Sequence, residues 1–325
     1  MAIPALPWRE AWQQALYSDY GYYRRENSCD LGFSTSVHGV PHASRVIARA
    51  VIALADRHGL DTVIDIGAHR AALAEALDQI GSSLRYIGVD VTGRPPHVGG
   101  ITQWWQAPGG AVLPDELDDV RDALVLAHEW LDVVPAVVAA RGPGGDWHEM
   151  WVDPQTGTGR LGPSLGPDDE EWLQQWVGPD VAVAEVGRSR DEALRQLLDR
   201  VTHGLIVVID YGHHRHARPV DGSLRGYQRG RRVDPVPDGS MDLTADVAID
   251  SLLAAVAPDE AWAEEQRDAL HGLLGPAMPP TTSMSRTDPQ GYLAALAESG
   301  ALAALTSPQS FGGFWWVCVD RSGVG

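Results

Sequence analysis

The pattern of apolar and polar positions first predicts a strand, a turn and a helix within Thr62–Leu77. Apolar Val63, Ile64 and Ile66 form a short run before a glycine, and an alanine-rich helical pattern follows. A second strand is expected over Leu84–Val91, one helix later. This succession is the opening unit of a doubly wound α/β domain. Ligands of such folds bind outside the carboxyl ends of the strands.

The same reading predicts the later elements. Helices are expected around Trp8–Tyr17, from Pro41 to about His58, and over Leu117–Ala123, Asp168–Val177, Ser189–Thr202 and Tyr292–Ala304. Strands are expected at Ile101–Trp105, Asp122–Trp130, Val181–Val186, Leu205–Asp210 and Phe314–Asp320, with a hairpin in Val137–Asp153 and a loop over Gly157–Pro167.

These elements suggest four segments along the chain. Residues 1–60 form an N-terminal helical and loop segment, and residues 61–212 form the Rossmann-like core. Residues 213–290 interrupt the alternation of strands and helices, and they are interpreted as a helical insertion that caps the substrate side. Residues 291–325 return to the core with a helix and a strand.

Composition narrows the function. The 325 residues carry a formal charge of −19, and all 25 basic residues are arginine. So acidic a surface repels phosphate backbones, so nucleic acid is not expected as a partner. Without lysine, Schiff-base and P-loop chemistry are excluded. No signal peptide or membrane span is predicted, which favours a cytoplasmic protein, and the 12 tryptophans leave a homodimer open.

A cofactor site is predicted at the turn that follows the first strand. The turn Gly67-Ala68-His69-Arg70-Ala71 has one glycine, whereas NAD or FAD folds need G-x-G-x-x-G. Asp90 ends the second strand, where it can accept hydrogen bonds from a ribose diol. A strand–helix turn without any cofactor remains the alternative.

Acidic residues are also expected at the ends of two further strands. Glu129 and Asp132 follow a buried strand, three residues apart, and would need a cationic partner such as an arginine or a guanidinium substrate. Asp132 could instead cap a helix. His128 could stack on an adenine or fill space, and Asp210 could face the site or cap the next segment. The HHRH run at 213–216 lacks a tetrahedral ligand set, so no metal site is expected.

Taken together, these stretches resemble the MidA-type (DUF185) class I S-adenosylmethionine-dependent methyltransferases. That family includes a mitochondrial complex I assembly factor that methylates arginine. The matching motifs are YSDYGYY (17–23), LGFST (31–35), the cofactor turn, HEWLDVVP (128–135), IDYG (209–212), GSMDLTADV (239–247), PQGYL (289–293) and FGGFWWVCV (311–319). The chain departs from the family at His69 and Ala71, and also at Gly32, His128 and Asp246.

The resemblance implies a Rossmann-like class I methyltransferase sheet and methyl transfer from S-adenosylmethionine to a nitrogen, with a protein or peptide arginine as the first candidate. Two alternatives stay open: a non-catalytic assembly or scaffold factor with an acidic groove, and methylation of a small metabolite or peptide. The residues assigned to the cofactor are Asp65, Gly67, Ala68, His69, Asp90, Val91 and His128. Those assigned to catalysis are Glu129, Asp132 and Asp210.

Overall fold

A computed structural model describes residues 4–25, 40–257 and 260–321 of the chain. Its centre is a seven-stranded sheet in the order β16-β17-β10-β5-β2-β3-β4. In that order the strands are Glu260–Glu265, Trp315–Asp320, Gly204–Asp210, Ala123–His128, Thr62–Ile66, Arg85–Asp90 and Ile101–Gln106. The strands from β10 to β4 are parallel, and β17 runs antiparallel to both of its neighbours. The predicted doubly wound α/β class is confirmed.

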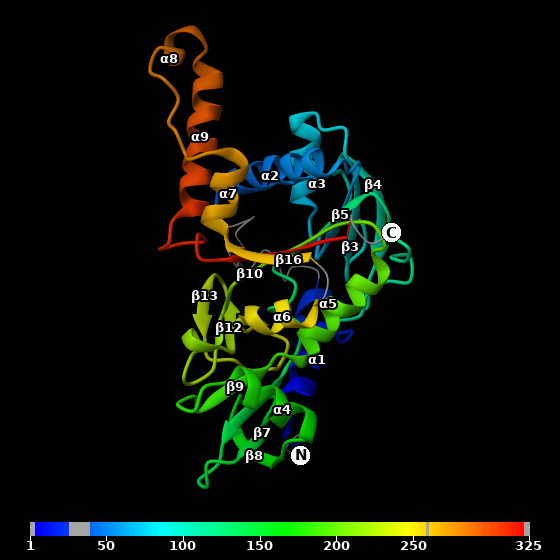
Figure 1. The fold of residues 1–325 in the computed structure, drawn as a ribbon, viewed down its shortest axis with the longest axis vertical. Coiled ribbons are helices and arrows are strands. Elements are labelled where there is room, and N and C mark those ends of the chain that lie inside the picture. Colours follow the sequence, from blue (N-terminus) through cyan, green and yellow to red (C-terminus); the bar gives the residue numbers. More distant parts are fainter. Residues whose placement is uncertain (1–3, 26–39, 258–259, 322–325) are drawn as a thin grey trace.

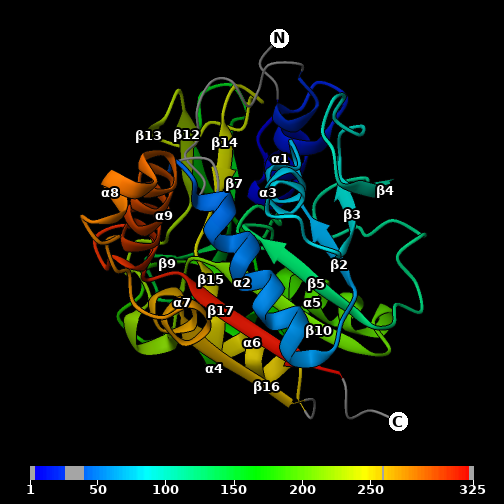
Figure 2. The same cartoon turned by 90° about the horizontal axis from the view of Figure 1, so that it is seen from above.

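Helices cover both faces of this sheet (Figures 1 and 2). One face carries α2 (Ala43–His58), α3 (Ala72–Ile80), α7 (Gln266–Leu274) and α9 (Pro289–Thr306). The other face carries α5 (Arg188–Arg200) and α6 (Ile249–Ala255). The β10 sequence LIVVID explains this arrangement: its alternate side chains enter the two opposite cores, so every residue of the strand is buried.

The chain between β5 and β10 forms most of a second, antiparallel sheet, and β1 (Leu6–Pro7) joins it from the N-terminal segment. The other strands are β7 (Trp147–Val152), β6 (Val137–Arg141), β9 (Val183–Val186) and, beside β7, β8 (Gly159–Ser164). α1 (Trp8–Tyr17) and α4 (Pro167–Trp176) pack against it. The predicted hairpin is confirmed, but the loop expected over Gly157–Pro167 is wrong, because β8 pairs with β7 there.

The segment 213–290, interpreted as a helical insertion, contains more strands than its sequence pattern suggests. Besides α6, α7 and α8 (Met284–Thr287), it holds β12 (Arg225–Gln228), β13 (Arg231–Val233), β14 (Asp242–Thr244), β15 (Val247–Ala248) and the core strand β16. β15 pairs with β11 (Gly212–His213), and short 3-10 turns occur at Tyr22–Arg24 and Arg215–Ala217. The insertion is therefore mixed, with a small sheet of order β13-β12-β14.

The helix expected over Leu117–Ala123 is a wrong prediction. The segment is irregular, with one isolated bridge between Val120 and Val201, and Ala123 already begins β5. Asp119 and Asp122 have φ angles of 44° and 55°, which a right-handed helix does not accept. The LGFST motif at 31–35 lies outside the described residues.

Candidate functional site

The acidic residues singled out in the sequence come together at one edge of the central sheet. In the register of the parallel strands, Asp65 lies opposite Leu126, and Ile209 lies opposite His128. The ends of β2, β3, β5 and β10 therefore meet at the same level. A cavity of about 530 Å³ opens there, lined by Asp65, Asp90, Glu129 and Asp132 among others. That volume lies within the usual range for small-molecule sites.

The turn after β2 keeps the backbone of a glycine loop although it holds one glycine. Gly67, His69 and Ala71 have φ angles of 77°, 47° and 56°. The N–H groups of Gly67 and Ala68 both donate to the carbonyl of Val89, at 2.9 and 3.1 Å. The residues that replace the family's glycines thus adopt the left-handed conformation themselves, at a cost of roughly 1–2 kcal/mol each.

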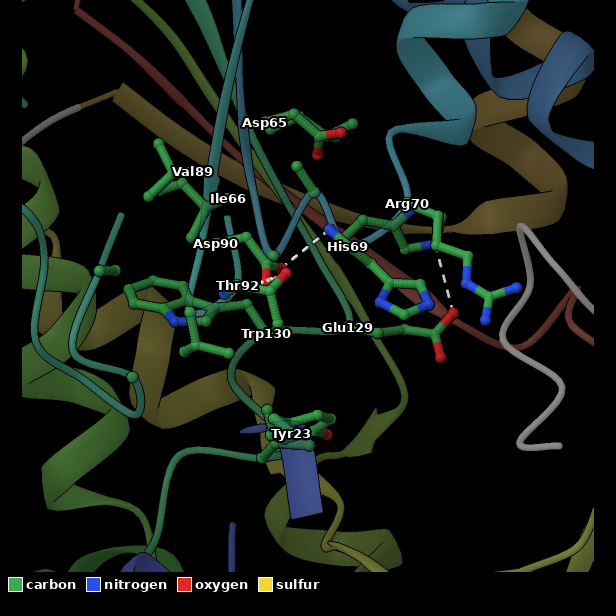
Figure 3. A pocket seen from close by; sticks show the side chains of 18 of the residues that line it. Tyr23, Asp65, Ile66, His69, Arg70, Val89, Asp90, Thr92, Glu129 and Trp130 are labelled. Atoms are coloured by element: carbon green, nitrogen blue, oxygen red, sulfur yellow. Dashed lines mark hydrogen bonds and ion pairs between the residues drawn. The ribbon is translucent and has the colours of Figure 1, made fainter. Parts of the chain in front are cut away.

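Hydrogen bonds of Asp90 link this turn to the end of β3. Its Oδ2 accepts from the His69 N–H at 2.8 Å, as Figure 3 shows. Its Oδ1 accepts from the N–H and the hydroxyl of Thr92, at 2.8 and 2.6 Å. A carboxylate offers about four acceptor sites, so these three bonds leave one, on Oδ2, for a ligand hydroxyl.

Asp65 lies deeper beside the same turn and is 6% exposed. Its Oδ2 accepts from the Tyr86 hydroxyl at 2.6 Å. Burial raises the pKa of Asp65 to about 7, although the Tyr86 hydrogen bond acts against the shift. A substantial share of this carboxyl is therefore protonated near neutral pH, and it can donate a hydrogen bond into the cavity.

Glu129 stands at the start of the turn after β5, in a conformation that favours glycine. Its φ angle is 53°, and its N–H donates to the Ile209 carbonyl at 2.8 Å. His128 Nε2 lies 3.6 Å from Glu129 Oε1, and both side chains are almost fully buried. Backbone strain of this kind at a cleft is typical of a residue held in place for function. In Figure 3 the carboxylate lies beside the His69 ring.

Asp132 and Asp210 form one buried network behind Glu129. Asp210 Oδ2 accepts from the N–H groups of Leu131 and Asp132, at 3.0 and 3.1 Å, and its Oδ1 accepts from the Tyr211 N–H at 3.0 Å. The Tyr211 hydroxyl donates to Asp132 Oδ2, and Asp132 Oδ1 has no hydrogen-bond partner in the described part of the chain. Asp210 does not line the cavity, so it acts on the site by shaping this turn.

The acidity of the two aspartates follows from their burial. Burial raises the pKa of Asp132 to about 6, and the Tyr211 hydrogen bond and the charges of Arg190 and Arg225 oppose the rise. Burial and the nearby Asp132 charge raise the pKa of Asp210 well above its usual value. The pair therefore shares a partly protonated state near neutral pH.

Two segments that are remote in the sequence add aromatic and acidic side chains to the cavity, which the strand pattern does not predict. Tyr17, Tyr22 and Tyr23 line the cavity, and the Tyr23 hydroxyl donates to Asp242 Oδ1 at 2.7 Å. Asp242 also lines the cavity, and burial raises its pKa to about 7. By composition alone, the segment that holds Asp242 is typical of a turn followed by a helix cap. Only its resemblance to a family motif could have signalled a place at the site.

A second cavity, of about 340 Å³, shares Glu129 with the first. Four aromatic rings line it, together with the guanidinium of Arg225. The rings belong to Tyr211, Tyr227, Phe311 and Phe314. Arg225 lies 4.7 Å from the centre of the Tyr211 ring, and its Nη1 donates to Asp246 Oδ1 at 2.6 Å. Glu129 thus stands where the two cavities meet.

Within residues 4–25, 40–257 and 260–321, no group of three or more histidine, cysteine or carboxylate side chains is arranged to hold a metal ion. His213 is buried, and burial lowers its pKa to about 4, so it is neutral at pH 7. In the same described ranges, no helix is long and apolar enough to cross a membrane.

The fold and the polar edge of its cavity define an α/β protein with a nucleoside-type site. Residues 64–264 match the model of a family described as "Putative S-adenosyl-L-methionine-dependent methyltransferase". Because the match spans more than half of the chain, the protein belongs to this family, and its cofactor is S-adenosylmethionine. The resemblance drawn from the motifs is confirmed. No curated protein sequence matches the chain.

Two solved structures share the fold. A COG1565 superfamily member from Burkholderia thailandensis, bound to S-adenosyl-homocysteine, is 22% identical, with a TM-score of 0.77; the match covers 99% of this chain and 89% of that one. A native structure of a COG1565 superfamily protein from the same organism is 23% identical, with a TM-score of 0.75 and coverages of 99% and 88%. The predicted class I methyltransferase fold is confirmed.

The cavity fits this cofactor. Its single remaining acceptor on Asp90 suits one ribose hydroxyl. Apolar side chains supply a surface for an adenine ring, among them Ile66, Val91, Leu113 and Trp130. A side chain at Gly67 would meet no atom within 4 Å, so the cavity beside the turn is open.

Proposed function

We propose that the protein methylates a nitrogen of an arginine side chain on a protein or peptide acceptor. The observation that carries this proposal is the position of Glu129, which lines both the cofactor cavity and the aromatic cavity. A group placed in the second cavity would lie beside this carboxylate, which also borders the first cavity. Arg225 is paired with Asp246, and Glu129 contributes a carboxylate to the lining.

A guanidinium group suits the second cavity because it is planar, cationic and weakly hydrated. Its faces stack on aromatic rings, and its edge pairs with a carboxylate. Phe311, Phe314 and Tyr227 would supply rings, and Glu129 would supply the carboxylate. Stacking and pairing together fix the orientation of the nitrogen, and such positioning contributes much of the rate in group transfer.

On the cofactor side, Asp90 would accept a hydrogen bond from the ribose, and the turn at Gly67 and Ala68 would lie along the methionine end, with Asp65 behind it. Val91 and His128 would border the adenosine, and His69 would lie beside the methionine portion. When bound, S-adenosylmethionine supplies an electrophilic methyl group. The residues named here hold it in place and exclude water from it.

The acceptor nitrogen must lose one proton as its new C–N bond forms and the S–C bond breaks. Asp132 would take that proton, since its Oδ1 has no hydrogen-bond partner within the described residues and it lines the cofactor cavity. A base must be ionised to act. With the pKa of Asp132 raised to about 6, activity is expected to rise with pH through about 6 and then level off.

The test combines transfer and binding. Labelled S-adenosylmethionine is supplied with arginine-containing peptides, their lysine counterparts and free arginine. The expected result is label on the arginine peptides, a loss of about 100-fold in kcat for Glu129→Gln, and unchanged cofactor affinity by calorimetry. Asp168→Asn, an exposed change on α4, is the control. Transfer to free arginine alone would favour a small-molecule acceptor. Cofactor binding without transfer to any acceptor would favour the scaffold alternative.

A further inference from the structure

The β12–β13 hairpin beside the second cavity is built on a tight turn. Gln228 pairs with Arg231, so the turn consists of Arg229 and Gly230. Their φ angles are 51° and 72°, and two consecutive positive values are typical of a type I′ turn. Such turns favour asparagine or glycine at the first position. Arginine there breaks the local rule, and turn geometry does not account for it.

The hairpin also concentrates positive charge in a very acidic chain. Four arginines lie between positions 225 and 232, and no acid occurs between Asp221 and Asp234, whereas the whole chain carries −19. Arg229, Arg231 and Arg232 are exposed. In the described part of the chain, none of these three side chains makes a hydrogen bond or an ion pair. Elsewhere many exposed arginines are paired, for example Arg188 with two aspartates.

Part of this charge lies at the second cavity. Arg225, Tyr227 and Gly230 of the hairpin line it. Because side chains alternate along a strand, Arg225 and Tyr227 lie on the same face of β12. Arg232 is the cross-strand partner of Tyr227 and lies on that face as well, whereas Arg231, the partner of Gln228, lies on the other face. Figure 1 shows the hairpin at the edge of the molecule, below the segment that follows α9.

We propose that the β12–β13 hairpin docks an acidic segment of the peptide or protein acceptor, next to the residue that enters the second cavity. The inference rests on the proposed function for the use of that cavity. Each guanidinium binds a carboxylate through two parallel hydrogen bonds, which gives orientation as well as attraction. The arginines of the hairpin would attract this acidic flank locally, although the whole chain carries −19.

A peptide fits this surface better than a nucleic acid. A phosphate backbone would extend past the three arginines onto a surface with a large negative excess, and repulsion there lowers affinity. A short acidic stretch of a peptide would contact only the hairpin and would not extend onto the acidic surface. The second cavity begins beside it, and its aromatic lining suits one inserted side chain.

The test measures binding of a fluorescent peptide with one arginine flanked by a run of glutamates, and of its glutamine counterpart, by anisotropy. The variant replaces Arg229 and Arg232 with glutamine. The control replaces two exposed arginines elsewhere, Arg9 and Arg57, with glutamine, and so changes the net charge equally. We expect the hairpin variant to bind the acidic peptide about tenfold more weakly, and the control variant to bind like the unchanged protein.

The possible results distinguish this proposal from its alternatives and from the proposed function. Equal weakening in both variants, or equal affinity for the glutamine peptide, would overturn the proposal. Tighter hairpin-dependent binding of a single-stranded oligonucleotide would overturn it in favour of nucleic acid. Because the readout is binding, docking that persists without any methyl transfer would support this inference while the proposed function fails. Methyl transfer with a KM that ignores the glutamates would do the reverse.

Discussion

The two sides of the cofactor cavity are held together in different ways. On the β2–β3 side, Asp90 bonds to His69 and Thr92, which lie within the same strand–turn unit. On the β5–β10 side, Asp132 bonds to Tyr211, 79 positions away, and its carbonyl accepts from Arg190, 58 positions away. The β2–β3 side is held by contacts within one sequence motif. The β5–β10 side is held by contacts between distant segments, which form only when the sheet has formed.

The two sides are therefore expected to have different roles in cofactor binding and in stability. The β2–β3 side offers the ligand an acceptor on Asp90 and an open turn, with few bonds to the remainder of the chain. The β5–β10 side places Glu129 in a strained conformation and holds it there by bonds from several elements. We therefore expect changes on the first side to alter cofactor affinity, and changes on the second to alter stability and turnover.

The largest predicted effect is a loss of stability in Asp210→Ala, on the β5–β10 side. It would leave the N–H groups of Leu131, Asp132 and Tyr211 buried without their acceptor. Each such loss costs about 1–3 kcal/mol, so we expect the free energy of unfolding to fall by about 3 kcal/mol or more. Chemical denaturation measures this fall. Asp146→Ala, on the exposed β6–β7 turn, should change stability by less than about 0.5 kcal/mol. A similar value for both variants would refute the role of Asp210.

This contrast also shows what the sequence could predict. The ends of β2, β3, β5 and β10 follow from apolar runs that stop at acids, and the parallel register then brings those acids to one edge. Local pattern suffices for that step. The fold class and the placing of Asp65, Asp90 and Glu129 could therefore be predicted.

The partners of these acids could not. Tyr23 pairs with Asp242 across 219 positions, and no periodicity encodes such a pair. The strands of the insertion are short, and the sequence before Asp242 is rich in turn residues. The pattern therefore does not predict that Asp242 lines the cavity. For Asp210, the sequence left two roles open, and only its bonds to backbone N–H groups distinguish them.

The next largest effect is expected on cofactor affinity. Asp90→Ala removes the remaining acceptor for the ribose and also releases the His69 N–H. Hydrogen bonds to charged groups contribute about 1.5–3 kcal/mol, so affinity for S-adenosylhomocysteine should fall about 10- to 100-fold in calorimetric titration. Thr92→Val keeps the carboxylate and removes only the bond from the threonine hydroxyl to Oδ1, and it should cost much less. An Asp90→Ala protein that binds as well as the Thr92→Val protein would place the ribose elsewhere.

Stability should depend on pH in an unusual direction. Carboxyls with the ordinary pKa of 3.8 lose their protons near pH 4, but burial raises the pKa of Asp65 and Asp242 to about 7. The folded state therefore binds more protons between pH 4 and pH 7, and its stability falls as pH rises through that window. We expect a higher melting temperature at pH 5 than at pH 8, measured by calorimetry.

Asp65→Asn sharpens that prediction. The amide oxygen can still accept from Tyr86, but no proton is lost at high pH. The variant should be more stable than the unchanged protein at pH 8 by about 1 kcal/mol, and should show a flatter dependence on pH. Asp118→Asn, at an exposed carboxyl, is the control and should leave the dependence as it was. A dependence that Asp65→Asn leaves equally steep would assign the protons to other groups.

The smallest effect lies in the cofactor turn itself. His69→Gly removes a side chain from a residue with φ of 47°, which relieves strain of roughly 1–2 kcal/mol. The more flexible unfolded chain offsets about 0.4–1 kcal/mol of this gain, so the net gain in stability should lie between about 0 and 1.6 kcal/mol. Ala68→Gly is the matched control: Ala68 is buried and has no positive φ, so the same change should destabilise. If both changes destabilise alike, the turn does not store strain at His69, and the left-handed backbone is simply what this sequence prefers.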